Sequence, residues 1–542
     1  MGRFAFPPSG VPVLSAGSEA ALRDSAGRTA LNTVTAWLAN VVGLVVGFFL
    51  TRFLIDQLGE RVYGLYSVGA SVAAWSAFVG VPIGTYASRY ATEHLERGDI
   101  PALNRTLSTS LGLSLIAALV LPLPVFFSAL EAHELLRVPD DLVPAAQAAI
   151  LIIGLGSVLT VVVRVWEATV FMSRRTYLKN FAETASRIVG VVVLVAWFTW
   201  FGPSVSMWLL TTVSLPLLLS IALVVPAASR GLPVKLVAVS LDRAELRRAL
   251  PFVSSLAVIG VSTLLFDNTD ALVISAMPEL GVGQVAAYDI GTRFQKLVRP
   301  FVEAFVLALS PGLVALASRG GKSALRENVS AHVRQLLLLS LIPTVGLAAV
   351  SEPFVAHWVG ETFVARSVPV MWIALASALL WGPGPYAFRV LVAVSRLRFV
   401  TVGALLAGLL NLGLSVFFVR FLDLGLVGVA AGTLISVVIW SDVALGLEVC
   451  WTVGLHPLTY LRQAWLPPAL CCPIMILVAF GLKQIWTPQS LLETLVQLGV
   501  SMSVLSGIAF AVGLTGEERT GLRAWLAARI ARLRGSPQAP GS

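Results

Sequence analysis

The chain is predicted to be an all-α polytopic membrane protein, and its composition and charge pattern both indicate this. Hydrophobic residues make up 57% of the 542 residues and charged residues only 12%, whereas charged residues are about 25% of a typical soluble domain. The mean hydropathy is +0.86. Long apolar runs alternate with short segments that carry most of the basic residues. The chain is therefore a multi-pass membrane protein rather than a row of soluble domains.

About fourteen apolar segments are long enough to cross a ~30 Å hydrocarbon core as helices. They cover roughly 31–52, 62–87, 106–129, 144–170, 187–202, 205–227, 252–277, 285–317, 335–358, 367–391, 399–420, 425–450, 464–486 and 490–515. The fifth and sixth meet near Gly202 and Pro203 and form a tight hairpin. The eighth is too long for one straight crossing, so we expect it to project from the membrane at its start or to bend at Pro300 and Pro311.

The distribution of basic residues predicts that both termini are cytoplasmic. With the N-terminus inside, most of the 38 Lys and Arg residues fall in cytoplasmic segments. The external segments hold only Arg52, Arg61, Arg137, Arg366, Arg420 and Lys483. This is a strong positive-inside signal, so the net charge of +9 needs no nucleic-acid partner. Residues 1–29 are expected to be a disordered tail, and residues 516–542 a basic tail whose "GLRAWLAARIARL" lies on the membrane surface.

A short internal repeat divides the chain into two lobes. Leu58, Gly59, Tyr66 and Gly69 recur at the same spacing as Leu280, Gly281, Tyr288 and Gly291. The first set opens the second predicted helix and the second set opens the eighth. We therefore expect a lobe of six helices at 30–229, a like-oriented lobe of six at 230–451, and two further helices at 452–515. Such a two-lobed protein holds its ligand between the lobes.

One membrane segment carries a charged face. The stretch "YDIGTRFQKLVRPFVEAFVLALSP" contains Asp289, Arg293, Lys296, Arg299 and Glu303. At about 100° per residue these five side chains share roughly 120° of one helix face. A charge at the centre of a bilayer costs about 2.5–3.5 kcal/mol even on the lenient insertion scale. This face must line a water-filled cavity or pair with other helices, and its positive balance indicates an anionic ligand.

Several other functions are excluded. The external loops are short, the longest running over about 130–143, so no external catalytic domain is present, and we assign no catalytic residue. The five His residues and the three Cys residues form no pattern of metal ligands or disulfides. The "RGGKS" stretch at 319–323 has Leu316 where a phosphate-binding loop requires glycine. We expect no cofactor, and transport must then use an ion gradient, the substrate gradient or the membrane potential.

Three segments resemble a known group. "LTRFLIDQLGERVYGLYSVGASVAAWSAFVGVPIGTYASRYATEHLERGD" is similar to the opening of bacterial polysaccharide exporters of the O-antigen flippase type. "DALVISAMPELGVGQVAAYDIGTRF" and "LLNLGLSVFFVRFLDLGLVGVAAGTLIS" are similar to their second lobe. The group belongs to the multidrug, oligosaccharidyl-lipid and polysaccharide exporter superfamily, akin to lipid II flippases. The resemblance implies an inner-membrane flippase for cell-surface polysaccharide biosynthesis, with an undecaprenyl-diphosphate-linked oligosaccharide as substrate and polymerases or glycosyltransferases as partners.

The resemblance also implies roles for the charged residues. Arg293, Lys296 and Arg299 are candidates for holding the diphosphate, because Arg offers a planar fork of donors and Lys a point charge. The alternative is internal pairing of Asp289 with Arg293 and of Glu303 with Arg299. Arg52 and Arg89 are further candidates, or anchors at the membrane interface. In the fourth helix, Arg164 and Glu167 are spaced to pair with each other.

Ion coupling is a further implied role. Asp267 and Asp270 lie in the seventh helix, where carboxylates indicate coupling to protons or Na⁺, or counter-ions for the cationic helix. In relatives with a sodium site, the matching oxygens would here come from Asp270, Asn411 and Thr433, although Ser415 stands where those relatives have an acidic residue. Two rival functions remain: a multidrug or cation antiporter on the same scaffold, and a membrane polysaccharide polymerase or ligase.

Overall fold

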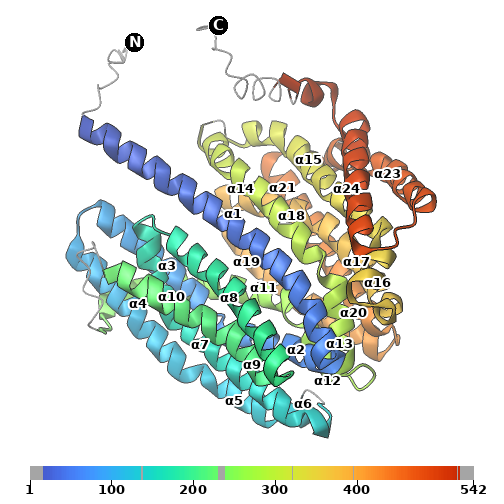
Figure 1. Ribbon diagram of the computed structural model, residues 1–542. Coiled ribbons are helices and arrows are strands. Elements are labelled where there is room, and N and C mark those ends of the chain that lie inside the picture. Colours follow the sequence, from blue (N-terminus) through green and yellow to red (C-terminus); the bar gives the residue numbers. More distant parts are fainter. Residues whose placement is uncertain are drawn as a thin grey trace, which may run out of the picture. The chain divides into compact units, whose positions relative to one another are not determined.

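The chain is helical throughout the part that the structure describes. The computed structural model describes residues 16–135, 138–229, 239–319, 321–394, 396–521 and 523–524, and every regular element in these ranges is a helix (Figure 1). This confirms the predicted all-α class of a polytopic membrane protein.

The described residues of the first half of the chain form eleven α-helices and two short distorted helices. They are α1 (Ala16–Leu58), α2 (Glu60–Ala77), α3 (Gly80–Glu96), α4 (Ile100–Val120), α5 (Pro122–Leu130), α6 (Ala132–Leu135), η1 (Asp140–Leu142), α7 (Val143–Met172), α8 (Tyr177–Phe201), α9 (Val205–Leu209), η2 (Leu210–Ser214), α10 (Leu215–Ser229) and α11 (Arg243–Asp267). The element η1 is a 3₁₀-helix and η2 is a π-helix.

The second half continues in the same manner. Its helices are α12 (Asp270–Ala276), α13 (Val282–Thr292), α14 (Gln295–Arg319), α15 (Gly321–Ala349), α16 (Ser351–Val359), η3 (Glu361–Phe363), α17 (Val364–Trp381), α18 (Pro383–Ala393), α19 (Leu397–Arg420), α20 (Gly425–Val437), η4 (Val438–Ala444), α21 (Leu445–Val453), α22 (Pro457–Tyr460), η5 (Leu461–Trp465), α23 (Leu466–Ile485), α24 (Leu491–Ile508) and η6 (Ala509–Gly513). Here η3 is a 3₁₀-helix, whereas η4, η5 and η6 are π-helices.

Twelve helices in the described ranges are long and apolar enough to cross a membrane, or thirteen if a bent pair is counted as one span. The bent pair is α2 and α3, which meet at 46°. The difference from the fourteen predicted spans lies in the second and eighth, because neither is one straight helix. The eighth is broken between α13 and α14, where the backbone N–H groups of Arg293 and Leu297 bond three residues back rather than four. The break therefore precedes Pro300 and Pro311, the predicted bending points, since α14 runs through both.

Many large apolar side chains of the candidate spans are exposed. Ile485, Leu119 and Trp200 are 85%, 79% and 77% exposed. A soluble protein rarely leaves so many such side chains in water. This outer surface therefore suits contact with lipid, as the composition predicts.

The contacts divide the chain into two compact units, each with its own core. Unit 1 comprises residues 1–53, 76–126 and 151–257, and unit 2 comprises residues 54–75, 127–150 and 258–542. Tyr86, Leu107 and Val161 are among the buried residues in the core of unit 1, and Leu336, Tyr386 and Val449 are among those of unit 2. These units do not follow the predicted lobe boundaries, which remain predictions.

The two predicted repeats share backbone features. Gly59 and Gly281 both adopt positive φ angles, of 82° and 74°, immediately before α2 and α13. A residue with a Cβ is strained at such angles, so glycine is required at the start of both helices. The sixth and twelfth predicted spans each contain a π-helix, η2 and η4.

The ends of the chain are described in part. The helix α1 begins at Ala16, so it starts within the segment expected to be a disordered tail, and residues 1–15 lie outside the described ranges. Most of the predicted surface helix near the C-terminus also lies outside them.

Candidate functional site

The charged face predicted in the eighth span lies in unit 2, at the break between α13 and α14. Asp289 is near the end of α13, Arg293 lies in the break, and Lys296 and Arg299 are in the first turns of α14. Because the helix is broken there, the five charges do not form the single continuous stripe that an unbroken helix would give.

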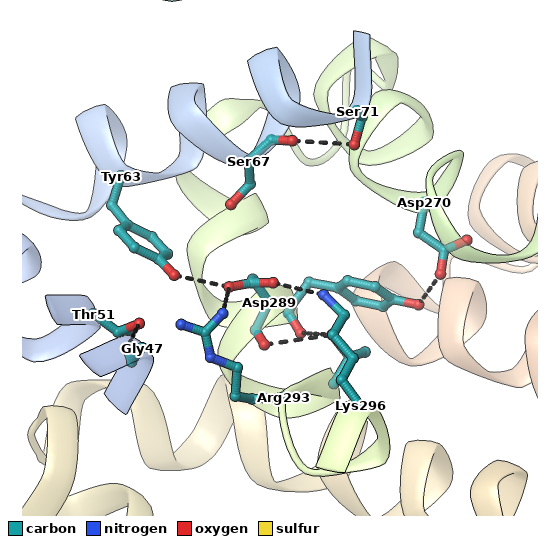
Figure 2. Close-up of polar contacts among 11 residues, drawn as sticks. Gly47, Thr51, Tyr63, Ser67, Ser71, Asp270, Asp289, Arg293 and Lys296 are labelled. Atoms are coloured by element: carbon teal, nitrogen blue, oxygen red, sulfur yellow. Dashed lines mark hydrogen bonds and ion pairs between the residues drawn. The ribbon is translucent and has the colours of Figure 1, made fainter. Parts of the chain in front are cut away.

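Asp289 is the centre of this group. Its carboxylate accepts a hydrogen bond from the Tyr63 hydroxyl at 2.8 Å and from the ammonium of Lys296 at 3.0 Å. The guanidinium of Arg293 lies 3.4 Å away. Figure 2 shows Tyr63, Arg293 and Lys296 directing their polar ends at this one carboxylate. We call these four residues the Asp289 cluster, and in it two cations share a single negative charge.

The exposure of the cluster members differs. The side chain of Asp289 is 14% exposed and that of Arg293 is 24% exposed, whereas that of Lys296 is 55% exposed. The carboxylate is therefore covered by its donors, while the ammonium of Lys296 is accessible to a ligand.

Arg299 has a different partner from the one the helical spacing indicates. Its guanidinium bonds to Asp267, at the end of α11, at 2.6 Å, and it lies over the ring of Trp381 at 5.0 Å. Glu303, one turn further along α14, is exposed. Asp267 thus acts as a counter-ion to the cationic segment, whereas the expected pair of Arg299 with Glu303 is not formed.

The residues considered for ion coupling form two hydrogen-bonded groups in unit 2. In the first, the Tyr288 hydroxyl donates to Asp270 at 2.5 Å (Figure 2). The Asn411 side-chain oxygen accepts from Thr433 at 3.2 Å and from Ser415 at 3.4 Å. Hydroxyl groups therefore occupy oxygens that a sodium ion would use. No group of three or more His, Cys, Asp or Glu residues in the described ranges is placed to hold a metal ion.

Arg52 and Arg89 belong to unit 1. Arg52 lies near the end of α1. Arg89 is exposed on α3, and its guanidinium is 5.6 Å from the rings of Tyr90 and Phe252. Arg248 of α11 lies over the same Tyr90 ring at 4.5 Å. We call these four residues, Arg89, Tyr90, Arg248 and Phe252, the Tyr90 cluster.

The fourth predicted helix differs from the simplest expectation. Glu167 pairs with Lys179 of α8 at 3.2 Å rather than with Arg164. The stem of Arg164 lies against Gly80 and Gly84 of α3, where an added Cβ would approach it to 3.3 Å. The two glycines make room for this arginine.

Several members of these groups are not indicated by the sequence pattern. Tyr63, Arg248 and Trp381 reach the charged residues from distant segments, so no local spacing indicates them. Asp442 was also missed, although its position in the apolar run "LISVVIWSDVALG" is a detectable signal.

The overall fold is that of known transporters. No family model and no curated protein matches the chain. A structure of the lipid II flippase MurJ in an inward closed conformation matches 88% of this chain and 99% of its own, with a TM-score of 0.66 and 16% identity. The chain shares this fold.

Two further solved structures have a similar fold. An inward-facing multidrug resistance MATE family transporter of the MOP superfamily matches 78% of this chain and 98% of its own, with a TM-score of 0.61 and 14% identity. A MOP superfamily transporter from Pyrococcus furiosus, described as having a binding pocket of reversed polarity, matches 78% of this chain and 93% of its own, with a TM-score of 0.54 and 16% identity.

Proposed function

We propose that this protein is a flippase of the inner membrane. It moves an undecaprenyl-diphosphate-linked oligosaccharide from the cytoplasmic to the outer leaflet, by alternating access of its two lobes, for cell-surface polysaccharide biosynthesis. The fold that the chain shares with a lipid II flippase supports this proposal. Both termini are then cytoplasmic, and polymerases or glycosyltransferases would supply or consume the substrate.

The Asp289 cluster is the observation that carries the proposal. Arg293 and Lys296 share one carboxylate, so this group keeps a positive charge after its internal pairs are counted. A diphosphate offers more acceptor oxygens than a single carboxylate and makes strong charge-assisted hydrogen bonds with Arg and Lys. It can therefore displace Lys296, which is the more exposed of the two cations, from Asp289.

The sign of the charge separates this proposal from cation or drug export on the same scaffold. Asp267 pairs with Arg299, and Asp289 pairs with Lys296. Asp270 accepts a hydrogen bond from Tyr288. Carboxylates engaged in this way are poor sites for an incoming cation. In the Pyrococcus furiosus relative, reversed polarity of the binding pocket is likewise taken to suggest a different function.

Ligand-induced thermal stabilisation tests this proposal. Purified protein in detergent is heated with and without an undecaprenyl-diphosphate-linked sugar, and the wild type is compared with Arg293→Ala. We expect the lipid to raise the Tm of the wild type and not that of the variant. Arg420→Ala is the matched control, because it removes an exposed arginine that pairs with Glu279 elsewhere in unit 2.

Two results would count against the proposal. If lipophilic cations stabilise the wild type and the lipid-linked sugar does not, the protein is a drug exporter. If Arg293→Ala responds to the lipid as the wild type does, the Asp289 cluster is not the headgroup site.

A further inference from the structure

A carboxyl group without a partner lies inside the second unit. Asp442 is in the π-helix η4, between α20 and α21, and both of its side-chain oxygens are buried. No described residue donates a hydrogen bond to either oxygen. Buried polar groups almost always have such a partner, so an orphaned carboxyl group requires an explanation.

No neighbouring charged side chain serves as a partner for Asp442. The elements packed against η4 are α17, α18, α19, α20 and α21. Outside η4 itself, the titratable and charged side chains on them and on α22 are Arg366, Tyr386, Arg389, Arg398, Arg420, Glu448, Cys450 and Tyr460. None of these arginines forms an ion pair with Asp442 in the described part of the chain. An ionised carboxylate buried without a cation costs several kcal/mol, so Asp442 is held as the neutral acid in this conformation.

The π-helix by itself does not require an acid. In η2, the π-helix of the sixth predicted span, the hydroxyls of Thr211 and Thr212 donate to the carbonyl of Trp208 at 2.8 and 2.9 Å. There, small hydroxyl side chains satisfy the distorted backbone. In η4 the chain instead places an ionisable group, and π-helical distortions often occur at functional sites.

A row of titratable groups leads from Asp442 to one end of unit 2. The Tyr460 hydroxyl lies 3.8 Å from the position that a Cβ would take at Gly446, one turn beyond Asp442. Tyr460 and Tyr386 belong to the same buried cluster, and the Tyr386 hydroxyl is 2.9 Å from Nδ1 of His332. All four groups can give or accept a proton.

The row ends at Glu518, beyond the last span. Glu518 accepts hydrogen bonds from Arg334 at 2.7 Å and from Gln335 at 3.1 Å, and both of these residues follow His332 closely on α15. The predicted orientation places this end on the cytoplasmic side. Hydroxyl and imidazole groups able to carry a proton are therefore found from the neighbourhood of Asp442 to that side.

We propose that Asp442 is a proton-binding site, loaded through Tyr460, Tyr386 and His332, which couples proton movement to the transport cycle. The carboxyl group binds one proton in the described conformation and releases it when η4 rearranges and water reaches the site. The coupling rests on the proposed transport function, whereas the binding of the proton does not.

Infrared spectroscopy of the purified protein tests the site without any substrate. At neutral pH we expect the carbonyl band of a neutral carboxylic acid in the wild type and its loss in Asp442→Asn, a variant of nearly the same size that cannot ionise. Glu448→Gln is the control, because Glu448 lies on the adjoining helix and has Arg396 at 3.7 Å. If the band persists in Asp442→Asn, Asp442 is not the protonated group and the proposal fails.

Exchange in heavy water tests the route. The band shifts as its proton is replaced by deuterium, and we expect Tyr460→Phe and His332→Gln to slow this shift severalfold while leaving the band in place. An unchanged exchange rate in both variants would overturn the route through these residues.

Transport of an undecaprenyl-diphosphate-linked sugar in liposomes tests the coupling. We expect a pH gradient to change the wild-type rate and to leave the rate of Asp442→Asn unchanged. If both proteins respond alike, Asp442 is a structural acid and the coupling is wrong. A wild type that does not move the lipid at all contradicts the proposed function, while the infrared result still decides whether Asp442 binds a proton.

Discussion

The Asp289 cluster of unit 2 and the Tyr90 cluster of unit 1 hold their arginines in different ways. In the Asp289 cluster, Arg293 and Lys296 contact a mostly buried carboxylate. In the Tyr90 cluster, Arg89 and Arg248 are exposed and lie over aromatic rings. No ion pair of either arginine with a carboxylate is found in the described ranges. A carboxylate fixes the position of a cation, whereas a ring supports it and leaves its donors available.

This difference indicates two uses of positive charge in one membrane protein. Exposed ion pairs contribute little to the stability of the fold. A cation or carboxylate that loses its partner in a covered site lowers that stability strongly. Charge changes should therefore affect stability strongly in the Asp289 cluster and weakly in the Tyr90 cluster.

The largest effect is expected from Asp289→Ala. The substitution leaves Arg293 and Lys296 without their carboxylate and Tyr63 without its acceptor, so we expect a loss of about 3 kcal/mol in stability. Thermal unfolding of the purified protein measures it. Glu60→Ala is the control, because it breaks the more exposed pair with Arg366 and should cost less than about 1 kcal/mol. Equal losses in the two variants would show that the Asp289 cluster is no more than a surface ion pair.

The sequence predicted the spans better than it predicted the partners of the charges. Span positions depend on long apolar runs, which are local and unambiguous. Arg299 and Glu303 both lie within α14, four residues apart as the predicted pairing requires. The partner of Arg299 is nevertheless Asp267 of α11, which only the packing of distant helices brings within reach.

Tertiary contacts explain the remaining omissions. Tyr63 is 226 residues from Asp289, so only the folded chain brings them together. The positive φ of Gly281, in contrast, agrees with the repeat that the sequence indicated. Local patterns thus located the charged segment, whereas the identity of each counter-ion depended on packing between distant helices.

A loss of stability of intermediate size is expected when Glu518 is replaced. This substitution tests the pairing of a carboxylate outside the membrane spans. Burial raises the pKa of the Glu518 carboxyl, but hydrogen bonds from Arg334, the Thr515 backbone and Gln335 outweigh it, so the pKa is lowered from its ordinary value. The pair therefore contributes its full stability above the ordinary pKa of glutamate and loses it as the pH falls through the lowered value. We expect Glu518→Gln to cost about 1.5 kcal/mol at neutral pH.

A pH series of unfolding measurements checks this sign. The difference in stability between the wild type and Glu518→Gln should shrink as the pH is lowered from neutral, because the wild-type carboxyl is then protonated. A difference that grows on acidification would contradict the pairing with Arg334. Glu517→Gln, the adjacent acidic position, is the matched control.

The smallest effect is expected in the Tyr90 cluster. Tyr90→Leu keeps apolar volume but removes the ring beneath Arg89 and Arg248, and an exposed cation–π contact contributes about 0.5–1 kcal/mol. We expect a loss of about 1 kcal/mol in thermal unfolding, with Tyr90→Phe close to the wild type because it keeps the ring. If Tyr90→Phe is as unstable as Tyr90→Leu, the hydroxyl rather than the ring supports the arginines. If Tyr90→Leu approaches the loss expected for Asp289→Ala, the aromatic support is as strong as a carboxylate, and the distinction between the two clusters is wrong.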